Sequence, residues 1–243
     1  MFLKIENEEI KEIYKQYLDN LNLDYEIKND EINVNLTLNK LESVLPLQYS
    51  ITVNIIEQII YFLQLLHEKN YTIINFNIDD FMIGINYNLS EIQKGGSIVR
   101  IEDKLLDEDN FKNISPEKIP FILFVNLDMI IPIDETNKII INNYDILIKN
   151  IEKSYNKISL KYKNYKENDS CLEKIQNKVK ITNKIGYYSL GIFIIIMLLY
   201  KKNGINVTNI EEKFKLKYIN TPLYHCVSRL IKKDEESRFL FYL

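Results

Sequence analysis

Apolar and charged residues alternate along the first twenty positions with the spacing of a helix. Ile10, Ile13 and Leu18 fall near one face, with Ile5 and Tyr14 beside them and charged residues between. A stripe of this kind is typical of an amphipathic helix that packs one face against a core. We therefore expect a helix near the amino terminus.

Several shorter segments have the pattern of strands. Residues 23–38 alternate apolar and polar side chains around a central Asn-Asp pair, which predicts a hairpin or two edge strands. Short apolar runs at 81–85, 121–126 and 138–143 predict further strands, separated by acidic, Asn-rich loops.

Two long apolar segments predict helices of the core. From Ile51 to Leu66 the apolar residues recur every three or four positions, so this helix should be buried on most sides. The segment from Tyr187 to Tyr200 is almost wholly apolar, but it is shorter than the about 20 residues of a membrane span, so a buried helix is expected. A polar helix or turn near 208–217 and an amphipathic helix near 222–233 follow it.

The composition is that of a globular protein, and it disfavours some classes of function. The 243 residues suffice for one large domain or two small ones, with 46% hydrophobic and 27% charged residues. A net charge of -3 and only 3 Arg disfavour nucleic-acid binding. The chain has 42 Ile, 29 Asn and no Ala, a bias that follows AT-rich codons, as in some giant DNA viruses and protozoa.

The cysteines and the amino terminus indicate a reducing, intracellular location. Cys171 and Cys226 match neither a metal-binding spacing nor a disulfide framework. The first residues lack the pattern of a signal peptide. We therefore expect a cytoplasmic or virion-associated protein.

Three patches in a fixed order resemble the carboxyl-terminal lobe of a protein kinase. Leu66 to Asn70 (LHEKN) ends the buried helix as kinases end the helix before their catalytic loop. Residues 71–80 then take the place of the loop with the pattern H-R-D-x-K-x-x-N. Gly186 to Gly191 (GYYSLG) is similar to the D-x-W/Y-S-L-G start of the central helix of that lobe. Ser228 to Arg238 is similar to the L-L-x-x-D-P-x-x-R element that ends the fold.

The resemblance covers roughly residues 38–243 and implies an α+β, protein kinase-like fold. It implies a reduced amino-terminal lobe at 1–50 and a mainly helical carboxyl-terminal lobe at 51–243, with an enlarged segment in about 88–184. The alternative is an unrelated α+β protein whose matching strings follow from its Ile- and Leu-rich composition.

By the same resemblance, the residues that phosphoryl transfer needs are replaced. Kinases use a glycine-rich loop, a strand lysine, a catalytic aspartate, and Asp and Asn side chains that hold metal. Ile73, Ile74 and Asn75 stand where histidine, arginine and aspartate are expected, and Asn77 replaces the loop lysine. A carboxamide cannot take the proton of an acceptor hydroxyl as a carboxylate does.

A contact with a metal or a nucleotide remains chemically open at a few positions. Asp80 stands at the position of the metal-binding asparagine, with Asp79 beside it; the alternative is that both only cap a turn. The D-F-G motif, whose aspartate binds magnesium in kinases, could correspond to either of two segments here, Asn126 to Asp128 or Asn143 to Asp145. We favour the first, because the strand before it is more apolar. Both place asparagine where the magnesium ligand belongs.

The glycine-rich loop and its lysine have no counterpart. The first glycine is Gly84, after the place where such a loop would lie. His67 and His225 lie on apolar helix faces, where structural roles are commoner than catalytic ones. The lysines before the long helix lie outside any V-A-I-K-like strand, and we expect surface charges at Lys4, Lys11, Lys15, Lys28 and Lys40.

The resemblance also implies an ion pair between two distant residues. Cys171-Leu172-Glu173 occupies the place of A-P-E, whose glutamate pairs with the final arginine in kinases. Glu173 and Arg238 are therefore expected to pair.

The favoured function is that of a pseudokinase, a catalytically inactive kinase-like protein that binds another protein as a scaffold. The partner would be a kinase or a virion component, bound through the enlarged segment in 88–184, and no cofactor is expected. One alternative is an atypical protein kinase that binds ATP and Mg²⁺ through Asp80 and Asp128. Another is a structural or virion protein with no nucleotide role. Nucleic acid and membrane are not expected partners.

Overall fold

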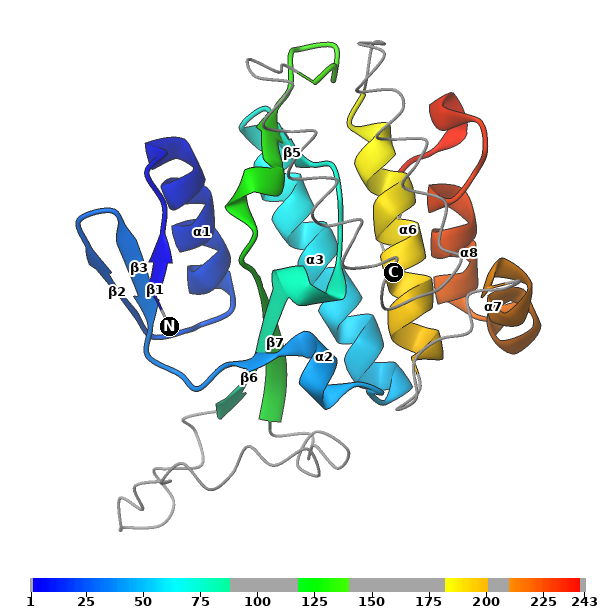
Figure 1. Cartoon of the computed structure of the whole chain (residues 1–243), viewed down its shortest axis with the longest axis horizontal. Coiled ribbons are helices and arrows are strands. Elements are labelled where there is room, and N and C mark those ends of the chain that lie inside the picture. Colours follow the sequence, from blue (N-terminus) through cyan, green and yellow to red (C-terminus); the bar gives the residue numbers. More distant parts are fainter. Residues whose placement is uncertain (1, 88–117, 140–181, 201–209, 241–243) are drawn as a thin grey trace.

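The computed structural model describes residues 2–87, 118–139, 182–200 and 210–240 (Figure 1). Within them the chain forms helices and small antiparallel sheets, a mixed α+β fold as expected. The elements in chain order are β1 (Phe2–Lys4), α1 (Glu8–Asn20), β2 (Tyr25–Lys28), β3 (Glu31–Val34), β4 (Asn39–Lys40), α2 (Leu41–Val44), α3 (Tyr49–Glu68), β5 (Tyr71–Ile73), η1 (Ile78–Asp80), β6 (Phe81–Tyr87), β7 (Lys118–Phe124), η3 (Leu127–Met129), β8 (Ile130–Pro132), α6 (Lys184–Leu199), α7 (Ile210–Tyr218), α8 (Pro222–Leu230) and η4 (Glu235–Ser237).

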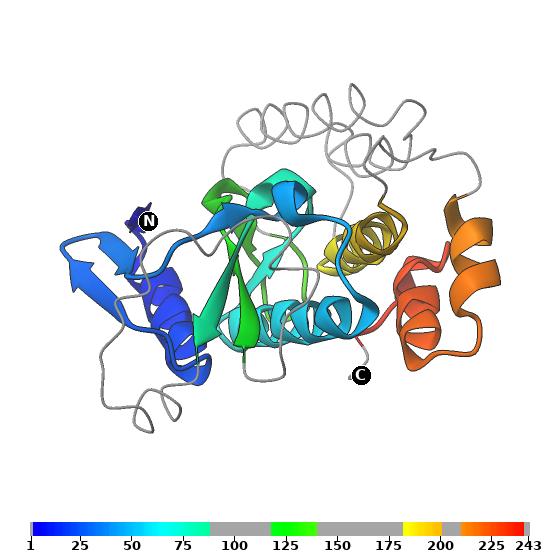
Figure 2. The same cartoon turned by 90° about the horizontal axis from the view of Figure 1, so that it is seen from below.

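The first sheet and α1 lie at one end of the described molecule (Figures 1 and 2). The strands pair antiparallel in the order β1-β3-β2, and Asn29 takes a positive φ of 55° at the turn between β2 and β3. Asparagine tolerates this conformation better than most residues, and the predicted hairpin is confirmed. The predicted helix is also confirmed from Glu8 onward, because the side chain of Asn7 accepts hydrogen bonds from the amides of Glu9 and Ile10.

The outer edge of the second sheet is covered by side chains from two helices. This sheet has the order β4-β6-β7, and no other described strand pairs with the far side of β7. Tyr14 and Tyr17 of α1 donate to the carbonyls of Phe124 and Ile122, each at 2.6 Å. Gln58 of α3 donates to another β7 carbonyl at 2.8 Å and accepts from the amide of Ile122 at 3.0 Å. These bonds satisfy buried backbone groups and attach α1 and α3 to the sheet.

The core is built around α3 and α6, as the apolar pattern predicted. Every residue from 189 to 197 in α6 is buried, which fits a helix that is hydrophobic on all sides. Among the described helices, α3 alone is long and apolar enough to cross a membrane. Buried core helices share that property, and 61% of its most apolar window is buried inside the fold.

Two short helices, α7 and α8, lie beside α6 at the end of the molecule opposite the first sheet (Figure 2). α7 and α8 confirm the helices predicted near 208–217 and 222–233, although α8 ends already at Leu230. Of the strand predicted at 138–143, only Lys138 and Ile139 are described, and each forms an isolated β-bridge.

Candidate functional site

The segment that the sequence places at the catalytic loop lies between β5 and β6. β5 pairs antiparallel with β8, and β6 pairs with β7 so that Phe81 faces Phe124. The residues just before β6 and just after β7 therefore lie at the same end of this hairpin. The whole stretch from 72 to 78 is buried. Because this stretch is mostly apolar, it packs as part of the core rather than as a surface loop.

Asn75, at the position of the catalytic aspartate, lies inside the fold. It is only 2% exposed, and its Oδ1 accepts a hydrogen bond from Ser189 Oγ at 3.0 Å. The same Ser189 oxygen accepts from the amide of Phe76 at 2.9 Å. The site is thus tied to the middle of α6 by polar groups that satisfy one another.

Ser189 is a residue of this site that sequence reasoning missed. It belongs to the GYYSLG string, but no role followed from that string alone. The available signal was the single serine within an apolar helical segment, since a buried hydroxyl needs a hydrogen-bond partner.

Asp80 and Asn126 meet at the shared end of the β6–β7 hairpin. Asn126 Nδ2 donates to Asp80 Oδ1 at 2.9 Å, although the two residues lie 46 positions apart. The backbone amide of Val125 also donates to the carbonyl of Asp80 at 2.8 Å. The structure therefore brings together one residue from the loop and one from the favoured D-F-G register. Asp80 is buried, whereas Asp128 is exposed in η3.

Asp79 lies in a different environment from Asp80. It is half-buried and contributes, with Glu42, to the acidic surroundings of Tyr200. Tyr200 donates from its hydroxyl to Glu42 Oε1 at 3.2 Å. Burial, followed by the charge of Glu42, raises the pKa of Tyr200 to about 12, so the phenol stays protonated. Asn77, at the position of the loop lysine, is buried before η1.

The described residues offer few ligands for a metal ion. No three His, Cys, Asp or Glu side chains in the described part of the chain gather closely enough to hold one. Asp80 and Asn126 supply oxygen atoms of the kind that Mg²⁺ prefers, and Mg²⁺ is commonly completed by water and phosphate oxygens. The amide N–H of Asn126 engages only Oδ1 of Asp80, so a cation could reach Oδ2 without displacing it.

Two of the expected sites involve residues outside the described ranges. These are the second D-F-G register, Asn143 to Asp145, and Glu173 of the expected ion pair. Arg238, the other member of that pair, donates from Nε to the carbonyl of Lys232 at 2.7 Å and from Nη1 to that of Lys184 at 3.3 Å. Its guanidinium carbon lies 4.7 Å from the ring centre of Tyr188. The pairing of Glu173 with Arg238 remains a prediction.

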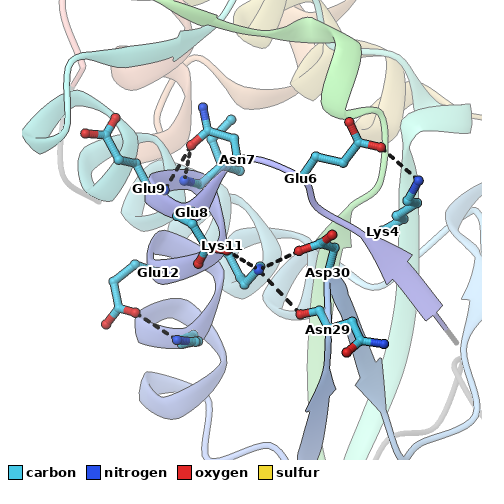
Figure 3. Close-up of polar contacts among 11 residues, drawn as sticks. Lys4, Glu6, Asn7, Glu8, Glu9, Lys11, Glu12, Asn29 and Asp30 are labelled. Carbon is cyan, nitrogen blue, oxygen red and sulfur yellow. Dashed lines mark hydrogen bonds and ion pairs between the residues drawn. The ribbon is translucent and has the colours of Figure 1, made fainter.

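The expectation of a surface charge was wrong for Lys11. Figure 3 shows its ammonium between α1 and the turn that joins β2 to β3. The side chain is 5% exposed, with Nζ at 2.6 Å from Glu8 Oε1, 3.1 Å from Asp30 Oδ1 and 3.4 Å from the carbonyl of Asn29. The hydrogen bond to Glu8 raises the pKa of Lys11, so the buried ammonium stays charged. Two of its acceptors lie on a hairpin distant in sequence, which helical periodicity could not reveal.

Lys4 lies in β1, a strand that the sequence did not predict. Its side chain is 65% exposed and pairs with Glu6 at 2.8 Å (Figure 3). Its neighbours Leu3 and Ile5 are buried. Because side chains alternate along a strand, the lysine points away from the side that the two apolar residues bury.

Comparisons with known proteins give weak structural matches. No protein-family model and no curated protein matches the sequence. The twitchin kinase region from C. elegans is similar over 98% of this chain, with 12% identity and a TM-score of 0.44. A C. elegans twitchin kinase fragment, described as autoregulated protein kinase and immunoglobulin domains, gives the same 98% and 12% with a TM-score of 0.43. The chain spans 39% and 48% of the lengths of these two proteins. No family follows from likeness at this level.

Proposed function

We propose that this chain is a pseudokinase, a kinase-like protein without catalysis, that acts by binding another protein. The proposal begins from the ordered sequence patches and rests chiefly on the burial of Asn75. A general base must come within hydrogen-bonding distance of the proton that it removes. Asn75 has no basic group, and its amide oxygen is engaged with Ser189 in the core.

The contact between Asp80 and Asn126 supports the same proposal. In an active kinase, acidic and amide side chains hold magnesium, which neutralises charge on the transferring phosphate. Here the amide N–H of Asn126 donates to Oδ1 of Asp80 at 2.9 Å. This hydrogen bond takes the place that a contact with a cation would have at that oxygen. Asn126 thus gives one oxygen of Asp80 a neutral hydrogen-bond partner.

The first sheet supports it as well. Active kinases need a strand lysine that reaches the phosphates and pairs with a helix glutamate. Lys4 instead pairs with Glu6, two residues further along the chain, at the surface. Lys11 is committed to Glu8 and Asp30 between α1 and the hairpin.

Adding ATP with Mg²⁺ is expected to leave the melting temperature unchanged and to give no phosphate incorporation. A ligand at 100 times its dissociation constant adds about 2.7 kcal/mol of stability, so binding of ordinary strength would be detected by thermal shift. Asp80→Ala is the matched variant. A clear shift in the wild-type chain that Asp80→Ala abolishes would contradict the proposal and favour the atypical kinase, in which Asp80 and Asp128 bind metal.

Protein binding is tested by removing residues 88–117, part of the segment proposed to bind the partner. Tyr87 and Lys118 are paired at the end of the β6–β7 hairpin where residues 88–117 connect the two strands. A two-residue Asn-Gly turn can therefore join them without changing the register. The shortened chain is expected to keep its melting temperature, because the described core is intact. In quantitative crosslinking in the native cell extract, a partner protein should be recovered with the full chain and should not be recovered with the shortened chain.

The comparison needs a control for non-specific losses. Replacing residues 88–117 with a Gly-Ser linker of the same length keeps chain length while removing the sequence. Equal recovery of the same partner by the full chain and both variants would contradict binding through this part of the segment.

A further inference from the structure

The first sheet has an open edge at β2. The strand order β1-β3-β2 places β2 at the margin, and no other strand that the structure describes pairs with its outer side. Figures 1 and 2 both show this strand at the end of the molecule away from α7 and α8. A strand in such a position presents backbone N–H and C=O groups with which another strand can pair.

The ladder with β3 determines which residues of β2 face outward. In an antiparallel ladder every second residue bonds to the neighbouring strand, and the residues between them point to the other side. The amide of Asn35 donates to the carbonyl of Asp24 at 3.1 Å, and the β2–β3 register continues from this pair without a break. The even-numbered residues of β2 therefore bond to β3, whereas Tyr25 and Ile27 direct their N–H and C=O groups to the open edge.

The side chains of β2 are divided between the two faces of the sheet. Ile27 pairs with Ile32, a fully buried residue, so it lies on the core side, where it is 37% exposed. Glu26 and Lys28 lie on the opposite side, with side chains that are 52% and 80% exposed and 2.9 Å apart. The solvent face of this edge thus carries one charge of each sign, on either side of Ile27.

We infer that β2 joins two copies of this chain, whose first sheets become continuous by antiparallel pairing about a two-fold axis at Ile27. At the axis, the two Ile27 residues exchange N–H···O=C hydrogen bonds, and their side chains meet on the core side. On the solvent side, Glu26 of each copy lies opposite Lys28 of the other. The joined sheet has the order β1-β3-β2-β2-β3-β1, and assembly stops at two copies because the edge it uses is then occupied.

The charges favour this register over its neighbours. Like charges directly opposite each other destabilise an antiparallel pair, whereas opposite charges stabilise it. A two-fold axis at Glu26 or at Lys28 would set that charge opposite its own copy. An axis at Tyr25 would set Glu26 opposite Asp24. Only the axis at Ile27 matches both charges of the strand.

The acidic residues just outside the strand do not oppose this register. An axis at Ile27 brings Asp24 of one copy toward Asp30 of the other, beyond the ends of β2. Asp30 turns back toward its own sheet, because its carbonyl accepts from the amide of Ile5 at 2.6 Å. Its carboxylate also binds Lys11 at 3.1 Å, so its charge is already compensated.

A second copy fits this edge better than other occupants. Charged side chains on an edge strand can also serve to prevent strand addition. Charges of one sign would repel an identical strand, but Glu26 and Lys28 match an identical strand once it is inverted. A strand from an unrelated protein would need the reverse order of charges at the same spacing. The second copy is therefore the occupant that the strand itself specifies.

The contact is small, which determines how it should be measured. Stable complexes bury about 800 Å² on each partner, and a strand of four residues offers less. The dimer is therefore weak and concentration-dependent. Added salt weakens it further, because its charge pairs are exposed to solvent.

Sedimentation velocity of the full chain, up to the highest concentration at which it stays soluble, is the first test. The wild-type chain is expected to show a monomer–dimer equilibrium. Ile27→Pro should abolish the dimer and keep the melting temperature near that of wild type. Proline removes an N–H that the ladder with β3 does not use, and it is tolerated where an edge strand faces solvent. A wild-type chain that stays monomeric throughout, or an unchanged dimer in Ile27→Pro, overturns the inference.

Amide hydrogen exchange locates the contact. Exchange at Ile27 in the wild-type chain should slow as the concentration rises, because only pairing with the second copy protects this amide. Exchange at Glu26 and Lys28 should be slow at every concentration, since both amides bond to β3. A dimer in which the Ile27 amide stays unprotected overturns the inference.

Exchanging the charges tests the register itself, and it decides the matter even if Ile27→Pro fails to fold. Glu26→Lys and Lys28→Glu should each raise the dissociation constant by about tenfold or more, because both cross-strand pairs then join like charges. An equimolar mixture of the two variants should restore the dimer, since each copy then faces the opposite charges. A mixture no better than its components overturns the inference.

Lys4→Glu is the matched control for the charge variants. Lys4 lies on the other edge strand of the same sheet and is 65% exposed, with a comparable partner in Glu6 at 2.8 Å. Its replacement should leave the dissociation constant unchanged, and a loss equal to that of Lys28→Glu overturns the inference. These outcomes are independent of the ATP and crosslinking experiments, because no residue near Asp80 or within 88–117 is changed.

Discussion

Replacing Gly186 with alanine is expected to lower the free energy of unfolding by about 3 kcal/mol. α6 approaches the end of β5 so closely that an added Cβ would overlap the carbonyl oxygen of Ile73 and lie 3.1 Å from its carbonyl carbon. Both are backbone atoms, so only a movement of α6 away from β5 relieves the overlap. The better helix propensity of alanine, about 1 kcal/mol, does not offset this displacement. Urea denaturation of the purified variant measures the change.

Gly191→Ala is the matched control, because it lies in the same helix and is also buried. Its added Cβ would meet the Ile231 side chain at 2.5 Å and the Leu230 Cβ at 3.0 Å. The isoleucine can change its rotamer, so the expected loss is smaller, about 1 kcal/mol. Equal losses in the two variants would show that the approach of α6 to β5 is not the limiting contact.

Acidification is expected to destabilise the fold through His67. Its Nε2 and Thr72 Oγ1 share a hydrogen bond at 3.2 Å, and the ring lies 5.8 Å from that of Tyr187. Burial lowers the pKa of His67 from 6.5 to about 4, so the folded chain keeps the imidazole neutral. Between pH 6.5 and about 4, His67 binds a proton in the unfolded chain but not in the folded chain. Over this window the free energy of unfolding should fall by about 3 kcal/mol.

The contribution of His67 is isolated by comparing the pH dependence of two chains. His67→Gln removes the titration and keeps a side chain that can bond to Thr72, so its stability should fall less than that of wild type as the pH drops from about 7 to about 4. Carboxylates titrate in both chains and cancel in the difference. His225→Gln, at an exposed histidine, is the control for replacing a histidine with glutamine. Parallel curves for His67→Gln and wild type would contradict the prediction.

Elements with a strong local pattern could be predicted from the sequence. The three- and four-residue period of α3 and the apolar run of α6 gave helices close to their observed bounds. The Asn-Asp pair located the turn of the first hairpin, because Asn29 adopts a left-handed conformation there. In these segments the local preference and the packed fold agree.

Elements that depend on distant partners were missed. β5 has three residues, too few for a period, and it exists because it pairs with β8 some sixty positions later. Burial of Lys11 likewise depends on Asp30 and the carbonyl of Asn29. An amphipathic pattern places a lysine on the solvent face of its helix, and it carries no information about a hairpin that covers that face.

The residues of the candidate site could also be predicted from the sequence only in part. Asn75, Asp80 and Asn126 could be named from the order of the motifs, because each occupies a defined place relative to an apolar segment. That Asn75 turns inward to Ser189 could not be predicted, because the two are 114 positions apart. The contact of Asp80 with Asn126 follows from the β6–β7 register, which one sequence does not define.

The covered edge of β7 has a consequence for how this fold would fail. The hydroxyls of Tyr14 and Tyr17 occupy carbonyls with which another strand could pair. If α1 detached while the β6–β7 hairpin persisted, the edge would become a template for strand addition by a neighbouring molecule. After Pro120, which cannot donate to a ladder, the strand continues as the uncharged apolar run 121–124, and such a run favours cross-β stacking. Detachment of α1 would therefore open the part of the edge at Phe124, while Gln58 of α3 still covers the part at Pro120 and Ile122.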